Sequence, residues 1–131
     1  MKSRKTLMAS GGLVLVACLF GQGCPGGIGT TLVDQRSSCT VELDGNCRVR
    51  VNFTPTAVGR TVRITVTGST NESRPVFGVD DANGNTVANF PNAVSNTVTD
   101  SFVVQSATVH FLTVRETAAT LATYDILVVQ N

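Results

Sequence analysis

Two cysteines carry the clearest chemistry of the chain. Cys39 and Cys47 flank an Asp44-Gly45 dipeptide, with seven residues between them. In an oxidising compartment such a pair forms a disulfide, and closing a ring of about nine residues stabilises a fold by roughly 2.5 kcal/mol. The alternatives are two reduced thiols or half of a metal site, but a tetrahedral zinc site needs four ligands at close spacing. We therefore predict a disulfide.

His110 is the only histidine and thus the main candidate for a general base. A base in nucleophilic catalysis needs a nucleophile and an orienting acid beside it. The sequence contains no Gly-x-Ser-x-Gly motif, and alternation with Leu112 and Val114 turns His110 inward. We predict a hydrogen-bonded core histidine, assign no catalytic residue, and expect a protein that is not an enzyme.

Oxygen ligands of the kind that calcium takes gather at Asp80, Asp81 and Asn83. The segment lacks the spacing and the distal glutamate of an EF-hand loop. Asp and Asn before Gly84 are also what a tight turn requires. We expect a hairpin turn and no cofactor, with a calcium site as the alternative.

Apolar residues are in surplus near the C-terminus. If alternate residues of 110–114 and 124–128 face the core, then Phe111, Leu127 and Val129 point the other way. A contiguous exposed apolar patch can mark a contact site. The sequence leaves two interpretations open: a contact patch, or side chains covered by the N-terminal hairpin or a loop.

The N-terminus has the pattern of an export signal. Lys2, Arg4 and Lys5 precede an uncharged run over 6–20, which matches the charged and apolar regions of a secretory signal. The run is shorter than the roughly 20 residues of a membrane-spanning helix. We therefore predict that this segment is removed and does not belong to the fold.

Two further cysteines compete for the cleavage point of this signal. Leu15-Val16-Ala17-Cys18 resembles the bacterial lipobox, which implies cleavage before the cysteine and diacylation of its sulfur. Cys24 has a looser match, yet its acylation would leave no odd thiol, because Cys18 would depart with the signal. The signal accordingly covers 1–17 or 1–23, and we expect the acylated residue to be Cys18 or, alternatively, Cys24. An ordinary secretory signal with neither cysteine acylated is the remaining alternative.

Charge argues against one class of partner. After Cys24 the chain has seven arginines against nine acids, a net charge of −2. Nucleic-acid binding needs a basic face or stripe. We expect no nucleic-acid partner.

The elements that would position these residues are strands. Gly, Thr and Ser without periodicity predict a flexible tether over 24–38, followed by one domain over 39–131. Period-2 alternation, as in 48–53 and 61–67, predicts antiparallel strands with one wet face. Seven or eight short strands follow, the last two (109–115 and 124–130) paired as a hairpin. The predicted fold is all-β, a single antiparallel, jelly-roll-like β-sandwich.

The order of strands and turns resembles the bacterial pre-peptidase C-terminal domain, a small β-sandwich found on exported proteins. The resemblance covers about 48–130 and depends on six segments: Val51-Asn-Phe53, Arg60-Thr-Val-Arg-Ile-Thr-Val66, Val76-Phe-Gly-Val-Asp80, Asn83-Gly-Asn-Thr-Val87, His110-Phe-Leu-Thr-Val114 and Tyr124-Asp-Ile-Leu-Val128. His110 departs from the family, which prefers Tyr there, and the cysteine-bearing hairpin is not part of the usual pattern. The resemblance implies an accessory module without catalysis of its own.

Together these observations predict an exported bacterial lipoprotein, anchored to a membrane and facing the periplasm or the cell exterior. Its sandwich would act as a binding or structural module for an envelope protein or a polysaccharide. The alternative function is calcium-dependent binding of a carbohydrate or a protein ligand.

Overall fold

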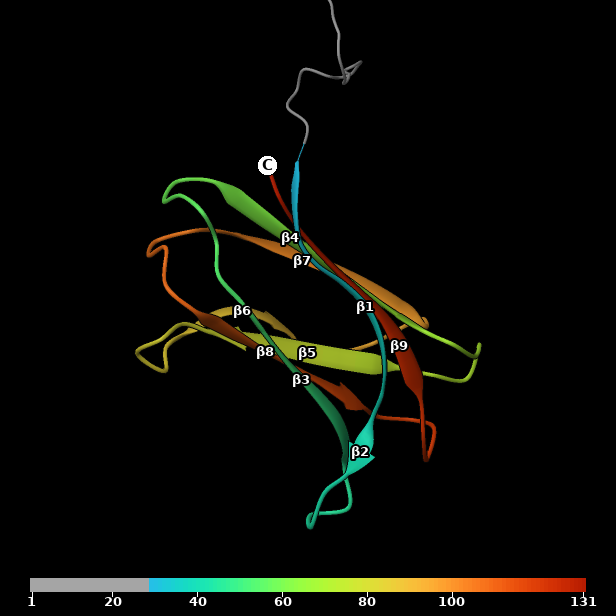
Figure 1. Ribbon diagram of the computed structural model, residues 1–131. Helices are drawn as coiled ribbons and strands as arrows, with labels where there is room; N and C mark the ends of the chain where they lie inside the picture. Colours follow the sequence, from blue (N-terminus) through green and yellow to red (C-terminus); the bar gives the residue numbers. More distant parts are fainter. Residues whose placement is uncertain (1–28) are drawn as a thin grey trace, which may run out of the picture. The chain divides into compact units, whose positions relative to one another are not determined.

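Alternating β-branched residues build two antiparallel sheets in the computed structural model, which describes residues 29–131 (Figure 1). These residues form nine strands and no helix. The strands are β1 (Thr30–Ser38), β2 (Thr40–Val41), β3 (Cys47–Phe53), β4 (Thr61–Gly68), β5 (Pro75–Asp80), β6 (Thr86–Phe90), β7 (Thr97–Val103), β8 (His110–Glu116) and β9 (Thr123–Gln130). One sheet has four strands in the order β1-β9-β4-β7, and the other has five in the order β2-β3-β8-β5-β6. The predicted all-β sandwich is confirmed.

One face of each sheet is buried against the other. Val62, Ile64 and Val66 on β4 alternate with more exposed residues and have no accessible surface themselves. The strands of the five-stranded sheet show the same pattern, as in Leu112 and Val114 on β8. Burying an aliphatic side chain of this size contributes roughly 1.5–3 kcal/mol. The inward faces therefore form one apolar core between the sheets, and only their outward faces can meet a ligand.

The two predicted tight turns are present. β2 pairs with β3 across Asp44-Gly45, and β5 pairs with β6 across the turn that contains Gly84. Gly45 and Gly84 have φ angles of 84° and 85°, in the left-handed region that glycine adopts without a steric penalty. Short turns of this kind set the register of both hairpins.

The predicted tether over 24–38 is wrong from Thr30 onward, because Thr30–Ser38 is strand β1 beside β9. Few side-chain contacts hold β1 in place: Val33 is buried, and Arg36 forms an ion pair with Asp125 of β9 at 3.1 Å. An edge strand is paired on one side only, so it needs few buried residues and shows weak alternation. That is why the sequence pattern did not reveal it.

The predicted hairpin between the last two strands is also wrong. β8 pairs with β3 and β5, whereas β9 pairs with β4 and lies next to β1. The chain crosses from one sheet to the other between Glu116 and Thr123. Both strands alternate as predicted, but alternation along a strand does not identify its partner.

Asp100 protects an edge of the four-stranded sheet. It lies on β7, the edge strand, opposite the fully buried Ile64 of β4, and thus at an inward-facing position. An inward-pointing charge on an edge strand discourages another strand from pairing there. We infer that partners do not readily add to the sheet along β7.

Candidate functional site

Cys39 and Cys47 form the predicted disulfide, with their Cα atoms 5.2 Å apart. The bond joins the chain just after β1 to the first residue of β3, and both cysteines are buried. The backbone N–H of Cys39 also donates to the carbonyl of Ala122, at 2.9 Å. Cys18 and Cys24 lie outside the described residues.

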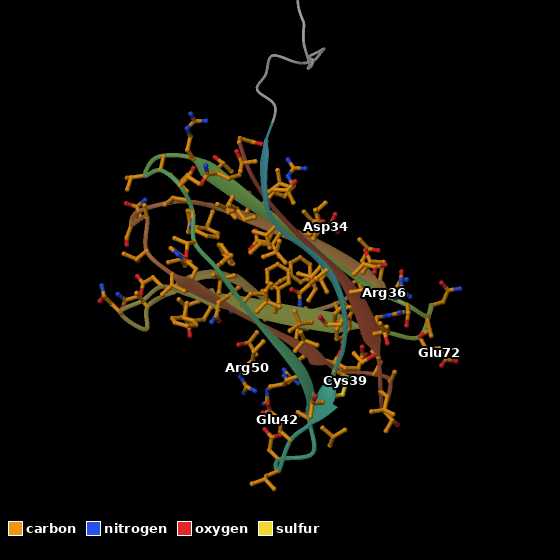
Figure 2. All side chains as sticks on the ribbon, viewed as in Figure 1. Asp34, Arg36, Cys39, Glu42, Arg50 and Glu72 are labelled. Carbon is orange, nitrogen blue, oxygen red and sulfur yellow. A yellow bond between two sulfur atoms is a disulfide. The ribbon has the colours of Figure 1, made fainter. Side chains whose placement is uncertain are left out.

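An ionic cluster surrounds the turn between β2 and β3 (Figure 2). Arg48 binds Glu42 at 2.9 Å and Asp44 at 2.8 Å, and Arg50 also pairs with Glu42. The hydrogen bond from Arg50 lowers the pKa of Glu42. The backbone N–H of Asn46, together with Arg48, lowers the pKa of Asp44 to about 2. Both arginines are therefore largely neutralised.

His110 is a core residue, as predicted. The residue is 1% exposed, and its ring stacks against those of Phe53 and Phe102, each centroid 5.5 Å away, in a cluster of three rings whose two Phe centroids lie 6.4 Å apart. Its Nδ1 lies 2.7 Å from the carbonyl oxygen of Thr108. This arrangement uses the imidazole for packing and leaves no face of the ring open to a substrate.

The residues that could have held calcium form a turn. The Oδ1 of Asp81 accepts hydrogen bonds from the backbone N–H groups of Asn83 and Asn85, both at 2.9 Å. The Oδ1 of Asp80 accepts one from the Thr86 hydroxyl at 3.0 Å. The bond from the Asn85 backbone is the main cause that lowers the pKa of Asp81. The carboxylate of Asp81 thus accepts the hydrogen bonds of backbone N–H groups within the hairpin turn.

Within residues 29–131, no cluster of three or more His, Cys, Asp or Glu side chains is arranged to hold a metal ion. The same residues include no helix long and apolar enough to cross a membrane.

The predicted apolar patch is not continuous. Phe111 is 41% exposed on the outer face of the five-stranded sheet, and Leu127 is 39% exposed on the outer face of the four-stranded sheet. Val129 lies two residues along β9 on the same side as Leu127. The three side chains point outward as predicted, but they lie on opposite sides of the sandwich. The prediction of one patch is wrong because it placed β8 and β9 in the same sheet.

A buried carboxylate that the sequence analysis missed closes one end of the sandwich. Glu116, at the end of β8, is 5% exposed. Its Oε1 accepts hydrogen bonds from the hydroxyls of Ser73 at 2.5 Å and Tyr124 at 2.9 Å. Its Oε2 accepts three backbone N–H groups, those of Arg74 (2.7 Å), Ala118 (3.0 Å) and Ala119 (3.0 Å). We call this set the Glu116 network.

The Glu116 network holds its carboxylate ionised. Burial raises the pKa of Glu116, but hydrogen bonds from the Ser73 hydroxyl and from the three backbone N–H groups outweigh burial and bring that pKa down to about 2. Burial and the hydrogen bond to Glu116 raise the pKa of Tyr124 well above its usual range. A carboxylate with every lone pair occupied by the protein serves the fold, since it ties the loop after β4 to the loop after β8.

Gly68 makes room for this network. A Cβ atom at Gly68 would overlap with the Oγ and Cβ atoms of Ser73, which must lie there to reach Glu116. The close approach of the β4–β5 loop to the end of its own strand therefore requires glycine. No local sequence signal identifies the network, because Ser73, Glu116 and Tyr124 come from three separate segments.

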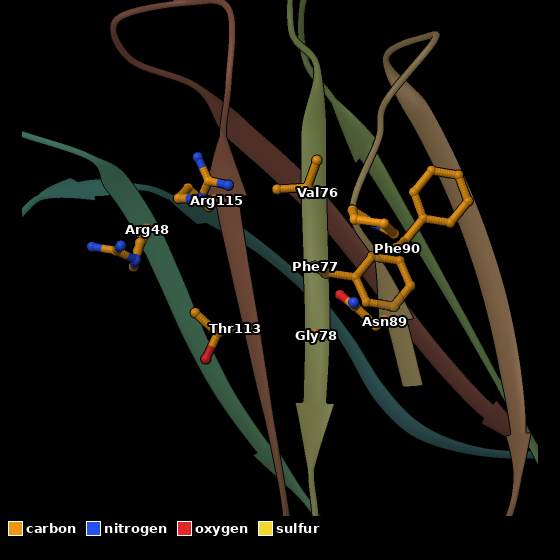
Figure 3. A pocket seen from close by; sticks show the side chains of 9 residues that line it. Arg48, Val76, Phe77, Gly78, Asn89, Phe90, Thr113 and Arg115 are labelled. Atoms are coloured by element: carbon orange, nitrogen blue, oxygen red, sulfur yellow. The ribbon is translucent and has the colours of Figure 1, made fainter. Parts of the chain in front are cut away.

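An open depression of about 250 Å³ lies on the outer face of the five-stranded sheet (Figure 3). At its centre is Gly78 of β5, which has no side chain, whereas the residues aligned with it carry side chains: Thr113 on β8 and Asn89 on β6. Val76, Arg115 and Pro91 complete much of the rim. The depression is thus the space on the sheet face that Gly78 leaves open because it has no side chain.

The space at Gly78 is not explained by the fold. A Cβ atom there would lie 3.8 Å from the nearest atoms, the carbonyl oxygen of Ala88 and Oδ1 of Asn89, which is ordinary van der Waals contact. A glycine inside a strand weakens it and often marks a place where another molecule approaches closely. Gly78 therefore differs from Gly68, whose missing side chain the packing requires. A lone Gly in the Val76-Phe77-Gly78-Val79 run was the available sequence signal.

Charge is uneven around the depression. Arg48 and Arg115 lie directly opposite each other in the β3–β8 register, an arrangement in which like charges repel. Arg48 has two carboxylate partners. The half-buried Arg115 has no hydrogen bond or ion pair from its guanidinium group to any residue in 29–131. The rim thus keeps one uncompensated positive charge.

Comparison with protein-family models gives no match, and comparison with curated proteins gives none either. The resemblance to the pre-peptidase C-terminal domain therefore remains a prediction from the sequence.

Proposed function

We propose that this chain is an exported, lipid-anchored protein of the bacterial cell envelope whose β-sandwich binds a ligand and carries out no reaction of its own. The depression around Gly78 is the observation that carries the binding role. It joins an open space, a polar rim and a positively charged group that the protein does not neutralise. Ligand sites combine a concave surface with a small number of polar or charged groups that orient the ligand.

The Cys39–Cys47 bond supports export. Disulfides form and persist outside the reducing cytosol, and this one closes the first hairpin of the sandwich. It agrees with the export signal predicted over the first residues of the chain, where Cys18 and Cys24 compete for acylation. Two acyl chains on one of them would hold the protein at a membrane, because each buried methylene contributes roughly 0.8 kcal/mol.

The roles of the reactive side chains support a module without catalysis. His110 is stacked in the core, and the Glu116 carboxylate is fully used by hydrogen bonds within the protein. Both groups are best explained by a role in stabilising the folded protein. This assignment matches the accessory role that a resemblance to the pre-peptidase C-terminal domain implies.

Intact mass tests the anchor. The full chain, produced with export in a bacterium, should begin at Cys18 or Cys24 and carry the mass of attached lipid. Cys18→Ser and Cys24→Ser are matched variants, and only one of them should abolish the added mass and release the protein from the membrane fraction. A mature protein without lipid in all three forms would contradict the proposed anchoring.

Co-sedimentation tests the binding role. The full chain in detergent should pellet with delipidated envelopes of the source bacterium, and Gly78→Val should reduce the bound fraction because its side chain fills the depression. Lipid-free envelope material removes the contribution of the anchor. Equal pelleting of the wild type and Gly78→Val, or none of either, would contradict a binding function at this site.

A further inference from the structure

We infer that the depression around Gly78 binds the carboxylated ring of an acidic polysaccharide, a hexuronate residue, with Arg115 as the group that recognises the carboxylate. This inference rests on the proposed binding function and names its ligand class.

The charge on the rim selects an anion. The guanidinium of Arg115 is planar and presents paired donors that match a carboxylate in two parallel hydrogen bonds. Glu42 and Asp44 form ion pairs with Arg48, so Arg115 is the cation of the rim that remains available to bind a ligand. A bound carboxylate would also relieve the repulsion between Arg48 and Arg115, which face each other across β3 and β8.

The shape of the depression favours a single ring. Its volume of about 250 Å³ lies just below the roughly 300–1,000 Å³ of sites for drug-sized ligands. It lies in the middle of the sheet face, with Thr113 and Arg115 on one side of β5 and Asn89 on the other (Figure 3). The open mouth would let the neighbouring sugars of a chain continue into solvent.

The lining fits the two sides of a sugar. The backbone at Gly78, with Val76 and Pro91, offers an apolar surface for the C–H face of a pyranose ring. The hydroxyl of Thr113 and the amide of Asn89 can each donate and accept hydrogen bonds, as ring hydroxyls require. These mixed polar groups stand at opposite sides of the floor, because both are aligned with Gly78 across the sheet.

An acidic protein segment fits less well. Extended peptides commonly bind by adding a strand to a free sheet edge, but the depression is on a face. Gly78 lies on β5, which is already paired on both sides, with β8 and with β6. The observations therefore favour a polysaccharide.

Isothermal titration of the full chain in detergent with polygalacturonate tests this inference. We expect binding in about 0.15 M salt, where long-range charge effects are largely screened. Arg115→Gln and Gly78→Val should each weaken binding at least about tenfold, since one removes the charge-assisted pair and the other fills the floor. The matched control is Arg63→Gln, which makes the same change in net charge on the outer face of the four-stranded sheet, and it should stay within about twofold.

Each other outcome overturns the inference. No binding of polygalacturonate would exclude a hexuronate as the ligand, and equal losses in Arg115→Gln and Arg63→Gln would exclude specific recognition at the depression. Normal binding by Gly78→Val would mean that charge alone attracts the polymer. Equally tight binding of poly-glutamate would show that the ligand class is an acidic protein segment. Melting temperatures of all variants, expected to equal the wild type, separate a lost ligand contact from a lost fold.

The envelope experiment distinguishes the two proposals. If Gly78→Val reduces binding to delipidated envelopes but polygalacturonate does not bind, the site exists and the ligand class is wrong. If neither material binds, the proposed binding function fails as well.

Discussion

Replacing Glu116 with Gln should lower the stability of the protein, and the loss should depend on pH. Glutamine has nearly the same shape, and its carbonyl oxygen can still accept the three backbone N–H groups. The negative charge is lost, however, and with it the strength of charge-assisted hydrogen bonds. The variant therefore isolates the contribution of ionisation within the Glu116 network.

The magnitude follows from the pKa of the buried carboxyl. Its ordinary value of 4.5 falls to about 2 in the folded protein, and such a difference corresponds to roughly 3–3.5 kcal/mol of stability. Because the folded-state pKa of Glu116 is lowered, this stability is fully present above about pH 4.5. It is lost as the pH falls toward about 2.

Urea unfolding of the wild type and of Glu116→Gln, at neutral pH and at several acidic pH values, measures the effect. The difference in free energy of unfolding should be roughly 3–3.5 kcal/mol at neutral pH and should shrink as acid protonates Glu116. Tyr124→Phe is the control: it removes one donor to Glu116 and keeps the charge, so most of the pH dependence should persist. A difference for Glu116→Gln that stays constant with pH would refute the reasoning.

Three further predictions concern other parts of the sandwich. Gly68→Ala should cost about 2 kcal/mol in urea unfolding, because the new methyl group overlaps with Ser73; unchanged stability would mean that the β4–β5 loop can move away from the end of β4 freely. Replacing Cys39 and Cys47 together by Ser should lower the free energy of unfolding by roughly 2.5 kcal/mol. The check is that this loss does not exceed the loss that a reductant causes in the wild type. Millimolar calcium should leave the melting temperature unchanged, since Asp81 already binds backbone N–H groups; a calcium-specific rise absent with magnesium would show that the turn holds a metal ion.

Alternation was sufficient to predict the class of the fold. Residues such as Val62 and Ile64 are buried at every second position, and that periodicity is visible without any knowledge of strand partners. The turns at Gly45 and Gly84 were predictable for a similar reason, because a left-handed backbone leaves a local mark on the sequence. The Cys39–Cys47 bond followed from spacing and compartment.

Strand pairing was not predictable from the same pattern. β8 and β9 are neighbours in sequence but belong to different sheets, and nothing in their alternation distinguishes a hairpin from a crossover. That single error produced the false patch of Phe111 and Leu127. β1 was missed because an edge strand buries few side chains.

The features that depend on several strands were beyond sequence reasoning. The Glu116 network joins Ser73, Glu116 and Tyr124 from separate segments. The depression depends on Gly78 lying between Thr113 and Asn89, which requires the order β8-β5-β6. Both features appear only when the sheet order is known.

The most direct test of the account is an NMR titration of the isotope-labelled full chain with trigalacturonate. We predict that the backbone amides of Gly78, Thr113 and Arg115 shift together and saturate, while the amide of Arg63 on the opposite face does not move. Shifts confined to the four-stranded sheet, or none at all, would contradict a ligand site in the depression around Gly78.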